Sequence, residues 1–366
     1  MKNIKSEESS ILKQSKFNAI SAADFADEEP EFVWYPYIPR GEYTVLMADG
    51  GTGKTTFCCG IASAISNGTA LPGCCVEENP TQGNVLFITG EERGGMLKKQ
   101  LKACNADLTK IVILDCMASE GLTFSEENEF QSVIEKYSPE LVIIDPWHCF
   151  LGASVDINRV NAVRPVFQKL ANIAKNCNCG IILVSHVNKR AQSENANNSA
   201  TGSTDFINAA RSAIKIIFSE EPGEENIRIA VHTKSNHASA GQSLKYRITH
   251  QKGLEWIGFS DITRRTLEEA ARCKKTPGEI IQKNVDINRA LFEVIQEKAV
   301  FDKHINISYD QFKDDYGAFI FETNQPKREI DKLSDKLNAI GIKVTTGKTV
   351  NYNKKTRNGF EIFKYL

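Results

Sequence analysis

Glycine is unusually dense in the stretch MADGGTGKTT, which runs from Met47 to Thr56. Glycine destabilises strands and helices alike, so such clustering makes sense where the backbone itself must wrap around a ligand. The apolar run YTVL precedes the stretch. The helix-length segment TTFCCGIASAI begins with the last two residues of the stretch, at Thr55. In that context successive backbone N–H groups can point at a phosphate, because no Cβ atom blocks its approach. The stretch therefore predicts a phosphate-binding loop.

Residues 48–55, ADGGTGKT, fit the Walker A pattern, with alanine at the usual first glycine position. Lys54 is expected to reach the β- and γ-phosphates of ATP as a point charge, and Thr55 to offer its hydroxyl to Mg²⁺. The alternative is a glycine-rich turn that merely precedes a helix, and the strand before the loop favours ATP binding over it. The predicted nucleotide-binding residues are Asp49, Gly50, Gly51, Thr52, Gly53, Lys54, Thr55 and Thr56.

Acidic residues end two other apolar runs. Asp145 follows the run LVII, and ligands bind at the carboxyl edge of such strands, so we expect it to hold Mg²⁺ together with Thr55. Glu91 and Glu92 follow the run VLFIT and a glycine, and one of them is expected to act as the general base on water. Glu91 is preferred. The alternative is a solvated acidic start to the next helix, which the helix dipole favours.

A polar residue also ends the run IILVS. His186 directly follows this run, with Lys189 close behind. At a strand tip beside the γ-phosphate, His186 is expected to sense whether that phosphate is present and to contribute to catalysis. The alternative is an ordinary exposed histidine at the end of a strand.

The elements that would position these residues alternate along the chain. Apolar runs of strand length are separated by amphipathic segments such as 55–67, 126–137 and 160–176. Several runs are apolar without interruption, which is typical of parallel strands buried on both faces. The alternation predicts an α/β fold with a doubly wound, mostly parallel sheet. The expected strands are 43–47, 84–89, 111–114, 141–144, 180–185, 212–218, 226–233 and 244–249.

The chain has 366 residues, more than one compact core usually spans, so we expect one large and one smaller domain. Residues 1–30 are polar and acidic and are expected to be flexible. Residues 31–260 form the predicted nucleotide-binding domain. The charged stretch 261–284 is predicted to be a linker with some helix, and a second domain is expected at 285–366.

Composition excludes several classes of protein. The net charge of −1 gives no overall attraction to nucleic acid or membrane, although a local basic patch remains compatible with it. No apolar run is long enough to span a bilayer, and the N-terminus has no apolar segment of a signal peptide. The ten cysteines are scattered without the spacing of a zinc site. We therefore expect a cytoplasmic protein with reduced thiols and no membrane partner.

The ordered set of motifs resembles the RecA-like ATPases of the AAA_25 and RepA-type group, the hexameric replicative helicases of plasmids and mobile elements. The resemblance covers roughly residues 16 to 250. It rests on the lead-in WYPYIPRG, the loop ADGGTGKT, Gly90-Glu91-Glu92, LVIIDP, SHVNK, the segment TGSTDFINAAR at 201–211 and the tripeptide Lys234-Ser235-Asn236.

The resemblance implies a ring, usually a hexamer, with ATP between subunits and single-stranded DNA in the central channel. The polar segment 189–205 would then face the channel, where Lys189 and Arg190 would touch phosphates; an exposed loop without a partner is the equal alternative. Related rings often carry a late lysine and arginine that act on the neighbouring subunit's nucleotide. Here Lys234 is kept as a catalytic candidate and the second basic residue is replaced, which weakens the case for efficient activation between subunits.

The second domain is read as three helices and strands. Helices are expected over 285–300, 308–317 and 324–341, and short strands over 342–345, 349–353 and 360–365, the first two joined by a TGK turn. This pattern suggests a winged-helix-like domain. Basic residues in its second half, with Tyr352 among them, could contact DNA phosphates and stack a base. The alternative is a surface that docks a replication protein. The basic residues are Lys343, Lys348, Lys354, Lys355 and Arg357.

Three functions are compatible with these residues. The leading one is an ATPase motor or loader on single-stranded DNA, a replicative helicase or helicase-like motor of a plasmid, phage or other mobile element. The second is a regulatory ATPase that oligomerises and docks a protein partner without unwinding DNA. The third is a metabolite kinase, which the phosphate loop alone permits, although no arginine-rich lid segment is evident.

Overall fold

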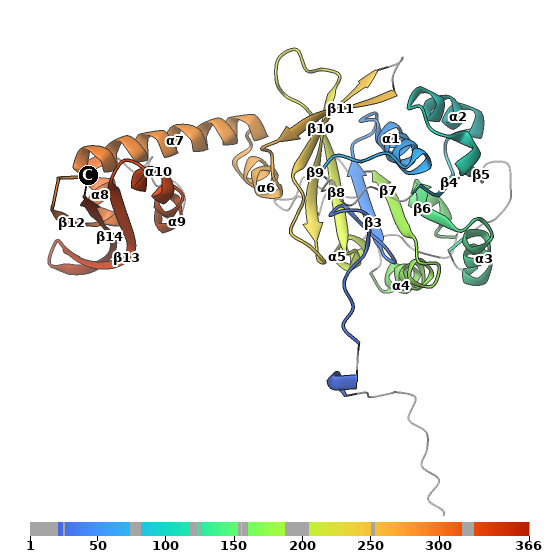
Figure 1. Cartoon of the computed structure of the whole chain (residues 1–366), viewed down its shortest axis with the longest axis horizontal. Coiled ribbons are helices and arrows are strands. Elements are labelled where there is room, and N and C mark those ends of the chain that lie inside the picture. The colour runs from blue at the N-terminus through green and yellow to red at the C-terminus, as the bar shows by residue number, and fades with distance from the viewer. Residues whose placement is uncertain are drawn as a thin grey trace, which may run out of the picture.

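The computed structural model describes residues 21–24, 26–73, 82–116, 123–124, 126–152, 155, 160–186, 205–249, 253–316 and 326–365. A large domain with a central sheet is joined by one long helix, α7, to a smaller C-terminal domain (Figure 1). Among the described residues, no helix is long and apolar enough to cross a membrane. Residues 189–204 of the segment predicted to face a channel, including Lys189 and Arg190, lie outside the described residues.

The central sheet has nine strands in the order β11-β10-β9-β8-β3-β7-β6-β4-β5. The last six in this order are parallel to one another, and β9, β10 and β11 run antiparallel at one edge. This confirms the predicted mostly parallel α/β sheet. The parallel strands are β3 (Tyr43–Ala48), β4 (Asn84–Thr89), β5 (Ile111–Asp115), β6 (Pro139–Asp145), β7 (Gly180–His186) and β8 (Ser212–Phe218). The antiparallel ones are β9 (Ile227–Ser235), β10 (Ser243–Thr249) and β11 (Gly253–Ser260).

Helices cover both faces of this sheet (Figure 1). On one face α1 (Lys54–Asn67) and α2 (Gly94–Ala103) pack side chains such as Phe57 and Leu97 on the strands. On the other, α3 (Glu127–Tyr137) and α4 (Val160–Asn176) pack Phe130 and Phe167. Successive strand residues alternate between the two cores, which is why the central strands read as unbroken apolar runs.

The lead-in to the sheet forms its own small structure. Strands β1 (Phe32–Trp34) and β2 (Ile38–Pro39) pair, and the buried Trp34 packs against Tyr37 and Trp256, with ring centroids 4.5 and 5.9 Å apart. The Tyr37 hydroxyl donates to the carbonyl of Gln242 at 2.7 Å. The lead-in therefore fastens the start of the domain to its late antiparallel strands.

Strand β11 was not expected, because the predicted pattern fades after Thr249. It pairs with β10 along its whole length, with a bulge between Lys245 and Tyr246. Its two glycines, Gly253 and Gly258, obscured the alternation, yet Leu254 and Trp256 pack against the core that contains α1. The antiparallel edge is thus one strand wider than predicted.

The predicted linker 261–284 is largely helical. Helix α6 (Arg264–Cys273) packs Leu267 against β9, and α7 runs from Pro277 to Lys298. The expected start of a helix at Val285 is therefore wrong. Thr276 caps α7: its hydroxyl accepts from the Glu279 backbone N–H at 3.2 Å, and the Glu279 carboxylate accepts from the Thr276 N–H at 2.8 Å. Threonine, proline and glutamate at these positions form a strong start signal for a helix.

The C-terminal domain has its own core, built from residues such as Leu291, Phe312, Leu337 and Phe360. Its helices beyond α7 are α8 (Tyr309–Tyr316), α9 (Pro326–Asp331) and α10 (Ser334–Asn338), so the long helix expected over 324–341 is interrupted. Its strands β12 (His304–Ser308), β13 (Ile342–Tyr352) and β14 (Lys355–Lys364) form an antiparallel sheet in the order β12-β14-β13.

The predicted TGK turn is not a turn. Gly347 has a φ of 77° and lies at a register shift between Thr346 and Lys348, so it forms a bulge within the continuous strand β13. The chain reverses at Asn353 and Lys354 instead, whose φ angles are 51° and 61°. A two-residue loop with both φ angles positive matches the twist of the flanking strands. The result is one long β13–β14 hairpin.

Candidate active site

The glycine-rich loop joins the end of β3 to the start of α1. Gly51 and Gly53 have φ angles of 74° and 89°, which side chains strongly disfavour. A Cβ atom on Gly53 would lie 2.3 Å from Cδ1 of Ile248, so a side chain there would also have to displace the end of the Ile248 side chain. From β9, the Arg228 Nε donates to the carbonyl of Thr52 at 3.2 Å and braces the loop. Arg228 was not among the predicted site residues.

Lys54 lies at the first turn of α1 and is 6% exposed. Its Nζ donates to the carbonyls of Ala48 and Asp49 at 3.1 and 2.9 Å, and it lies 3.1 Å from Nδ1 of His186. Burial lowers the pKa of Lys54, while the carboxylates of Asp145 and Asp49 act in the opposite direction. Among the described residues, the hydrogen-bond partners of the Lys54 ammonium group are therefore two backbone carbonyls of its own loop and one imidazole.

Thr55 and Asp145 meet across the edge of the sheet. The Thr55 hydroxyl donates to Oδ2 of Asp145 at 2.7 Å. Burial raises the pKa of Asp145, and the Thr55 hydrogen bond and the nearby Lys54 lower it. A hydroxyl and a carboxylate that converge on one point are the protein ligands that Mg²⁺ takes beside a nucleotide phosphate. This donor set fits the predicted metal site.

Sheet register explains why distant residues converge here. Strand β7 lies between β3 and β6, so the chain ends of three parallel strands are adjacent. Ala48 is level with His186, and Thr89 of β4 is level with Asp145. The loop, the metal ligands and the two glutamates therefore share the carboxyl edge of the sheet, where parallel strands bind ligands.

The two adjacent glutamates face different partners. Glu91 Oε2 lies 3.7 Å from Nε2 of His186, so His186 stands between Lys54 and Glu91. The Glu92 carboxylate accepts from the Gln100 amide of α2 at 2.6 Å, and burial raises its pKa. Glu91 is about half exposed, with a side-chain exposure of 55%. Of the two glutamates, Glu91 therefore has the carboxylate that is exposed to water and lies on the side of His186 and Lys54.

Two polar residues that were not predicted from the sequence also lie at the carboxyl edge of the sheet. His148 and Cys149 lie on a short 3₁₀ helix, η3 (Trp147–Phe150), directly after Asp145 and Pro146. His148 Nε2 is 3.8 Å from Oε1 of Glu91, and burial lowers the pKa of His148. The sequence did contain a signal for them. A histidine and a cysteine that follow Asp145 within four residues must lie near the edge of the sheet where that strand ends.

Lys234 lies at the opposite end of the sheet. It pairs with Ala213 near the start of β8, whereas the loop follows the end of β3. Its Nζ donates to the carbonyl of Ile207 at 3.1 Å and to that of Asn208, both in the short helix α5 (Asp205–Ala209). Burial lowers the pKa of Lys234, as do Arg211 and Arg264 nearby. Lys234 is therefore not a neighbour of the loop in its own subunit.

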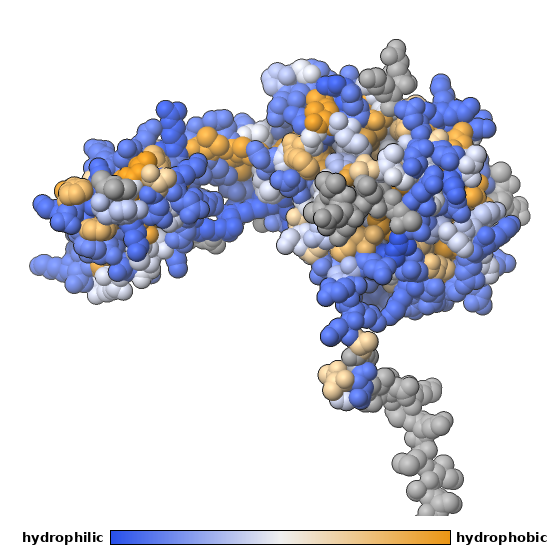
Figure 2. All heavy atoms as spheres, in the orientation of Figure 1, coloured by the Kyte–Doolittle hydropathy of each residue, from blue (hydrophilic) through white to orange (hydrophobic). Residues whose placement is uncertain are grey.

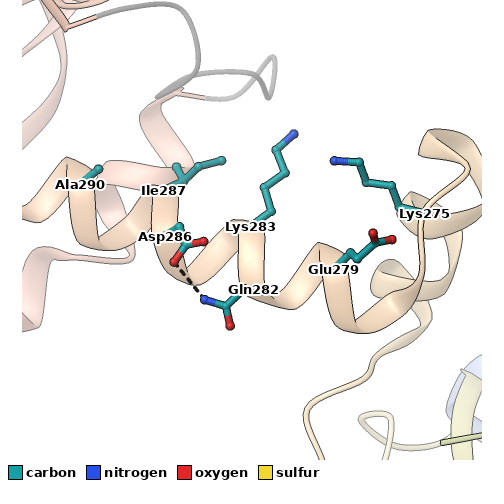
Figure 3. Close-up of a pocket in the computed structure, with 7 residues that line it drawn as sticks. All are labelled: Lys275, Glu279, Gln282, Lys283, Asp286, Ile287 and Ala290. Carbon is teal, nitrogen blue, oxygen red and sulfur yellow. Dashed lines mark hydrogen bonds between the residues drawn. The ribbon is translucent and has the colours of Figure 1, made fainter. Parts of the chain in front are cut away.

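A cavity of about 580 Å³ lies away from this site, along α7. In Figure 3 the side chains of Lys275 and Lys283 extend to the same side of α7, and Gln282 donates to Asp286 at 2.9 Å. A hydrophobic patch crosses the otherwise hydrophilic surface over α7 (Figure 2), where Val285 is 52% exposed. This cavity contains none of the predicted nucleotide-binding residues.

Comparisons with known proteins point to one family. A family model described as an AAA domain, AAA_25, matches residues 7–192, just over half of the chain. Over 154 residues the chain is 26% identical to the DNA repair protein RadA of Streptococcus pneumoniae (strain ATCC BAA-255 / R6). That match covers 41% of this chain and 31% of RadA, so the chain spans less than a third of that relative's length. A KaiC-like protein of Pyrococcus horikoshii OT3 shares 19% identity and a TM-score of 0.42, over 60% of this chain and 90% of that one.

Proposed function

This chain belongs to the AAA_25 family of RecA-like P-loop ATPases, and on that premise we propose that it is a ring-forming ATPase motor on single-stranded DNA. The most specific role we propose is that of a replicative helicase or helicase-like motor of a plasmid, phage or other mobile element. The observation that carries the ATPase part is the contact between Thr55 and Asp145 beside the glycine-rich loop. It brings both proposed metal ligands next to the lysine that would meet the phosphates.

In the proposed reaction, the backbone N–H groups of residues 49–56 bind the phosphates of ATP, and Lys54 exchanges its two carbonyl partners for phosphate oxygens. Thr55 and Asp145 would hold Mg²⁺, whose charge offsets that of the phosphates. Glu91 accepts a proton from the attacking water, because its carboxylate is exposed beside the loop while that of Glu92 is engaged by Gln100. His186, which lies between Lys54 and Glu91, would respond to the presence of the γ-phosphate.

Two features support the proposed action on DNA. The relative RadA is named a DNA repair protein, which motivates DNA as the ligand here. The C-terminal domain has the element order helix, strand, helices and hairpin of a winged helix, and exposed lysines lie at the tip of the hairpin. Lys354 and Lys355 are exposed there, and no ion pair engages either of them within the described residues. Such lysines are suited to contact a phosphate backbone.

A second candidate function has its own support in the same hairpin. Lys348 pairs with Glu361 at 3.1 Å and Arg357 pairs with Asp310 at 3.1 Å, so two of the five predicted basic residues are already partnered within the domain. The Tyr352 hydroxyl donates to Asp314 at 2.9 Å. A hairpin with mixed charge favours docking of a protein such as a replication factor. The chain would then be a regulatory oligomer that does not unwind DNA.

One set of measurements separates these functions. ATP hydrolysis by the full chain is measured with Mg²⁺, with and without single-stranded DNA, and particle mass is measured with and without a non-hydrolysable ATP analogue. We expect hydrolysis that rises with DNA and a nucleotide-dependent oligomer. A rate of hydrolysis and an oligomer size that do not change with DNA would favour the regulatory function. Phosphorylation of a small-molecule acceptor would favour a kinase. Lys54→Ala should abolish turnover in each case, because the γ-phosphate loses its point charge.

The role of the hairpin is tested by Lys354→Gln combined with Lys355→Gln. We expect weaker binding of single-stranded DNA and a smaller dependence of binding on salt, since two phosphate contacts are removed. The matched control is Lys98→Gln with Lys99→Gln, an adjacent exposed lysine pair on α2. Equal loss in both variants would show only a general charge effect, and would count against DNA contact by the hairpin.

A further inference from the structure

Three side chains of types that ligate transition metals lie close together, and one of them is the proposed catalytic base. They are the carboxylate of Glu91, the imidazole of His148 and the thiol of Cys149, and their ligand atoms all lie within 4.8 Å of one another. Glu91 comes from the loop after β4, whereas His148 and Cys149 come from η3 after β6. The two adjacent strand ends therefore supply one compact cluster with three different donor atoms.

The spacing is close to what a small tetrahedral ion requires. With bonds of about 2.0–2.3 Å to zinc, two tetrahedral ligands lie roughly 3.3–3.8 Å apart. The Glu91 Oε1 to His148 Nε2 distance is already 3.8 Å. Glu91 and Cys149 are both exposed, so an ion can enter from solvent.

The fold holds the two segments together without help from an ion. Trp147 and Phe150, on either side of the two ligands, are 0% and 2% exposed and anchor η3 in the core. The Gly90 N–H donates to the carbonyl of Asp145 at 3.1 Å, joining the two strand ends. A Cβ atom on Gly90 would lie 2.8 Å from Cβ of Cys149, so glycine is what permits this close approach.

We propose that Glu91, His148 and Cys149 form a binding site for Zn²⁺ or a similar transition metal, and that its occupation switches ATP hydrolysis off. A thiolate and an imidazole select such ions, whereas Mg²⁺ prefers oxygen ligands alone and is served by Thr55 and Asp145. The thiol of Cys149 gives up its proton to solvent when the ion binds. Three protein ligands leave one coordination position for water.

Inhibition follows from the shared ligand. A carboxylate that coordinates Zn²⁺ is a much weaker base, because the charge of the ion opposes addition of a proton, so it no longer takes one efficiently from water. This consequence rests on the proposed role of Glu91 in hydrolysis, whereas metal binding itself does not. The two parts can therefore be tested separately.

Metal binding is tested by titrating Co²⁺, a spectroscopic substitute for Zn²⁺, into the full chain without nucleotide. We expect a near-ultraviolet thiolate-to-cobalt absorption band at one equivalent, which competing Zn²⁺ removes. Cys149→Ser should abolish the band, and His148→Ala should weaken Co²⁺ affinity at least about tenfold, since even outer-shell partners of metal ligands are worth about 10–100-fold. Cys273→Ser is the control, because Cys273 is an exposed cysteine at the end of α6. No band, or a band unchanged in Cys149→Ser, overturns the site.

Regulation is tested by adding Zn²⁺ to MgATP turnover and then removing it with a chelator. We expect reversible inhibition of the native chain, and at least about tenfold more Zn²⁺ for the same fractional inhibition of Cys149→Ser, each measured against that protein's own turnover without Zn²⁺. Equal inhibition of both proteins overturns the switch even if cobalt binds. A chain that binds Co²⁺ through Cys149 but never hydrolyses ATP would contradict the proposed function and leave the metal site established.

Discussion

Glu91 and Glu92, which lie near the glycine-rich loop, are proposed to have different roles because their side chains point in different directions. Glu91 and Glu92 are neighbours in sequence, but one faces His186 and the other is held by Gln100 of α2. Sequence order alone could not make this distinction, because both follow the same strand. The orientation of α2 decides it.

This division predicts different outcomes for two matched substitutions. Glu91→Gln should keep nucleotide binding and lose hydrolysis by about two orders of magnitude or more, the usual worth of a positioned base. Glu92→Gln should remain near native turnover, because an amide at Glu92 can still bond to Gln100. Single-turnover hydrolysis and binding of a fluorescent ATP analogue measure the two effects. If Glu92→Gln is the inactive variant, the base is misassigned by one residue.

Within strands β8 and β9, one buried histidine ties the sheet to the lead-in. His232 is 3% exposed; its Nδ1 accepts from the Gly241 N–H at 2.9 Å, and its Nε2 lies 3.0 Å from Oγ of Ser212. The Ser212 hydroxyl donates to the carbonyl of Tyr37 at 2.6 Å, so its oxygen accepts from Nε2–H. The ring is therefore neutral, and protonation would set a new N–H against the N–H of Gly241.

Burial lowers the pKa of His232 from 6.5 to about 4. Between these values the unfolded chain binds a proton that the folded chain does not, so the free energy of unfolding should fall as pH drops from 6.5 to 4. The full loss is about 3 kcal/mol, with no contribution above pH 6.5. Urea unfolding at several pH values, followed by tryptophan fluorescence, measures it, since Trp34, Trp147 and Trp256 all lie in the large domain.

His232→Gln should reduce the pH dependence in that window. His304→Gln is the control, because His304 lies in the C-terminal domain, outside the domain that holds all three tryptophans. A native-like slope in His232→Gln would assign the acid sensitivity to other groups.

How well each element could be predicted depended on where its residues are buried. Strands such as 84–89 and 212–218 were predicted to the residue, because apolar residues predominate in each of them. Strand β11 and the continuous β13 were missed, since each contains glycine that usually marks a turn but here lies within a strand. For the site, the sequence indicated residues that end strands. It could not show that Arg228, from an antiparallel strand far along the chain, braces the loop.

The independence of the two cores leads to a prediction for truncation. The core of the C-terminal domain involves residues from Leu291 to Ile362, separate from the two cores around the central sheet. Because α7 begins at Pro277, removing residues 277–366 deletes the whole helix, whereas a cut at Val285 would leave its first turns attached. We expect basal ATP hydrolysis to persist and DNA or partner binding to weaken. Loss of folding on this truncation, seen by circular dichroism, would show that α7 belongs to the large domain's core.

In the proposed ring, Lys234 would contribute to ATP hydrolysis in the neighbouring subunit rather than in its own. Lys234 lies at the opposite sheet end from the loop and is bonded to carbonyls at the end of α5, where a cation also stabilises a helix terminus. We propose that in a ring Lys234 acts on the nucleotide of the neighbouring subunit. A cation supplied in this way can be worth about 10³-fold in rate.

We therefore expect Lys234→Ala to lose most ATP hydrolysis yet still bind nucleotide, and to regain some turnover when mixed with Glu91→Gln. A mixed interface combines one intact Glu91 with one intact Lys234. Lys245→Ala is the control, because Lys245 on the next strand pairs with Glu224 at 2.7 Å and should not affect turnover. Unchanged activity of Lys234→Ala, or no rescue on mixing, would assign Lys234 a structural role in holding α5.

Helix α7 connects the two domains as one capped, unbroken rod of 22 residues (Figure 1). At about 1.5 Å per residue it is roughly 33 Å long. A tilt of about 10° at its base would carry its far end through roughly 6 Å, without any change inside either domain. A small tilt at the base of α7 would therefore become a larger displacement of the C-terminal domain, including its β13–β14 hairpin.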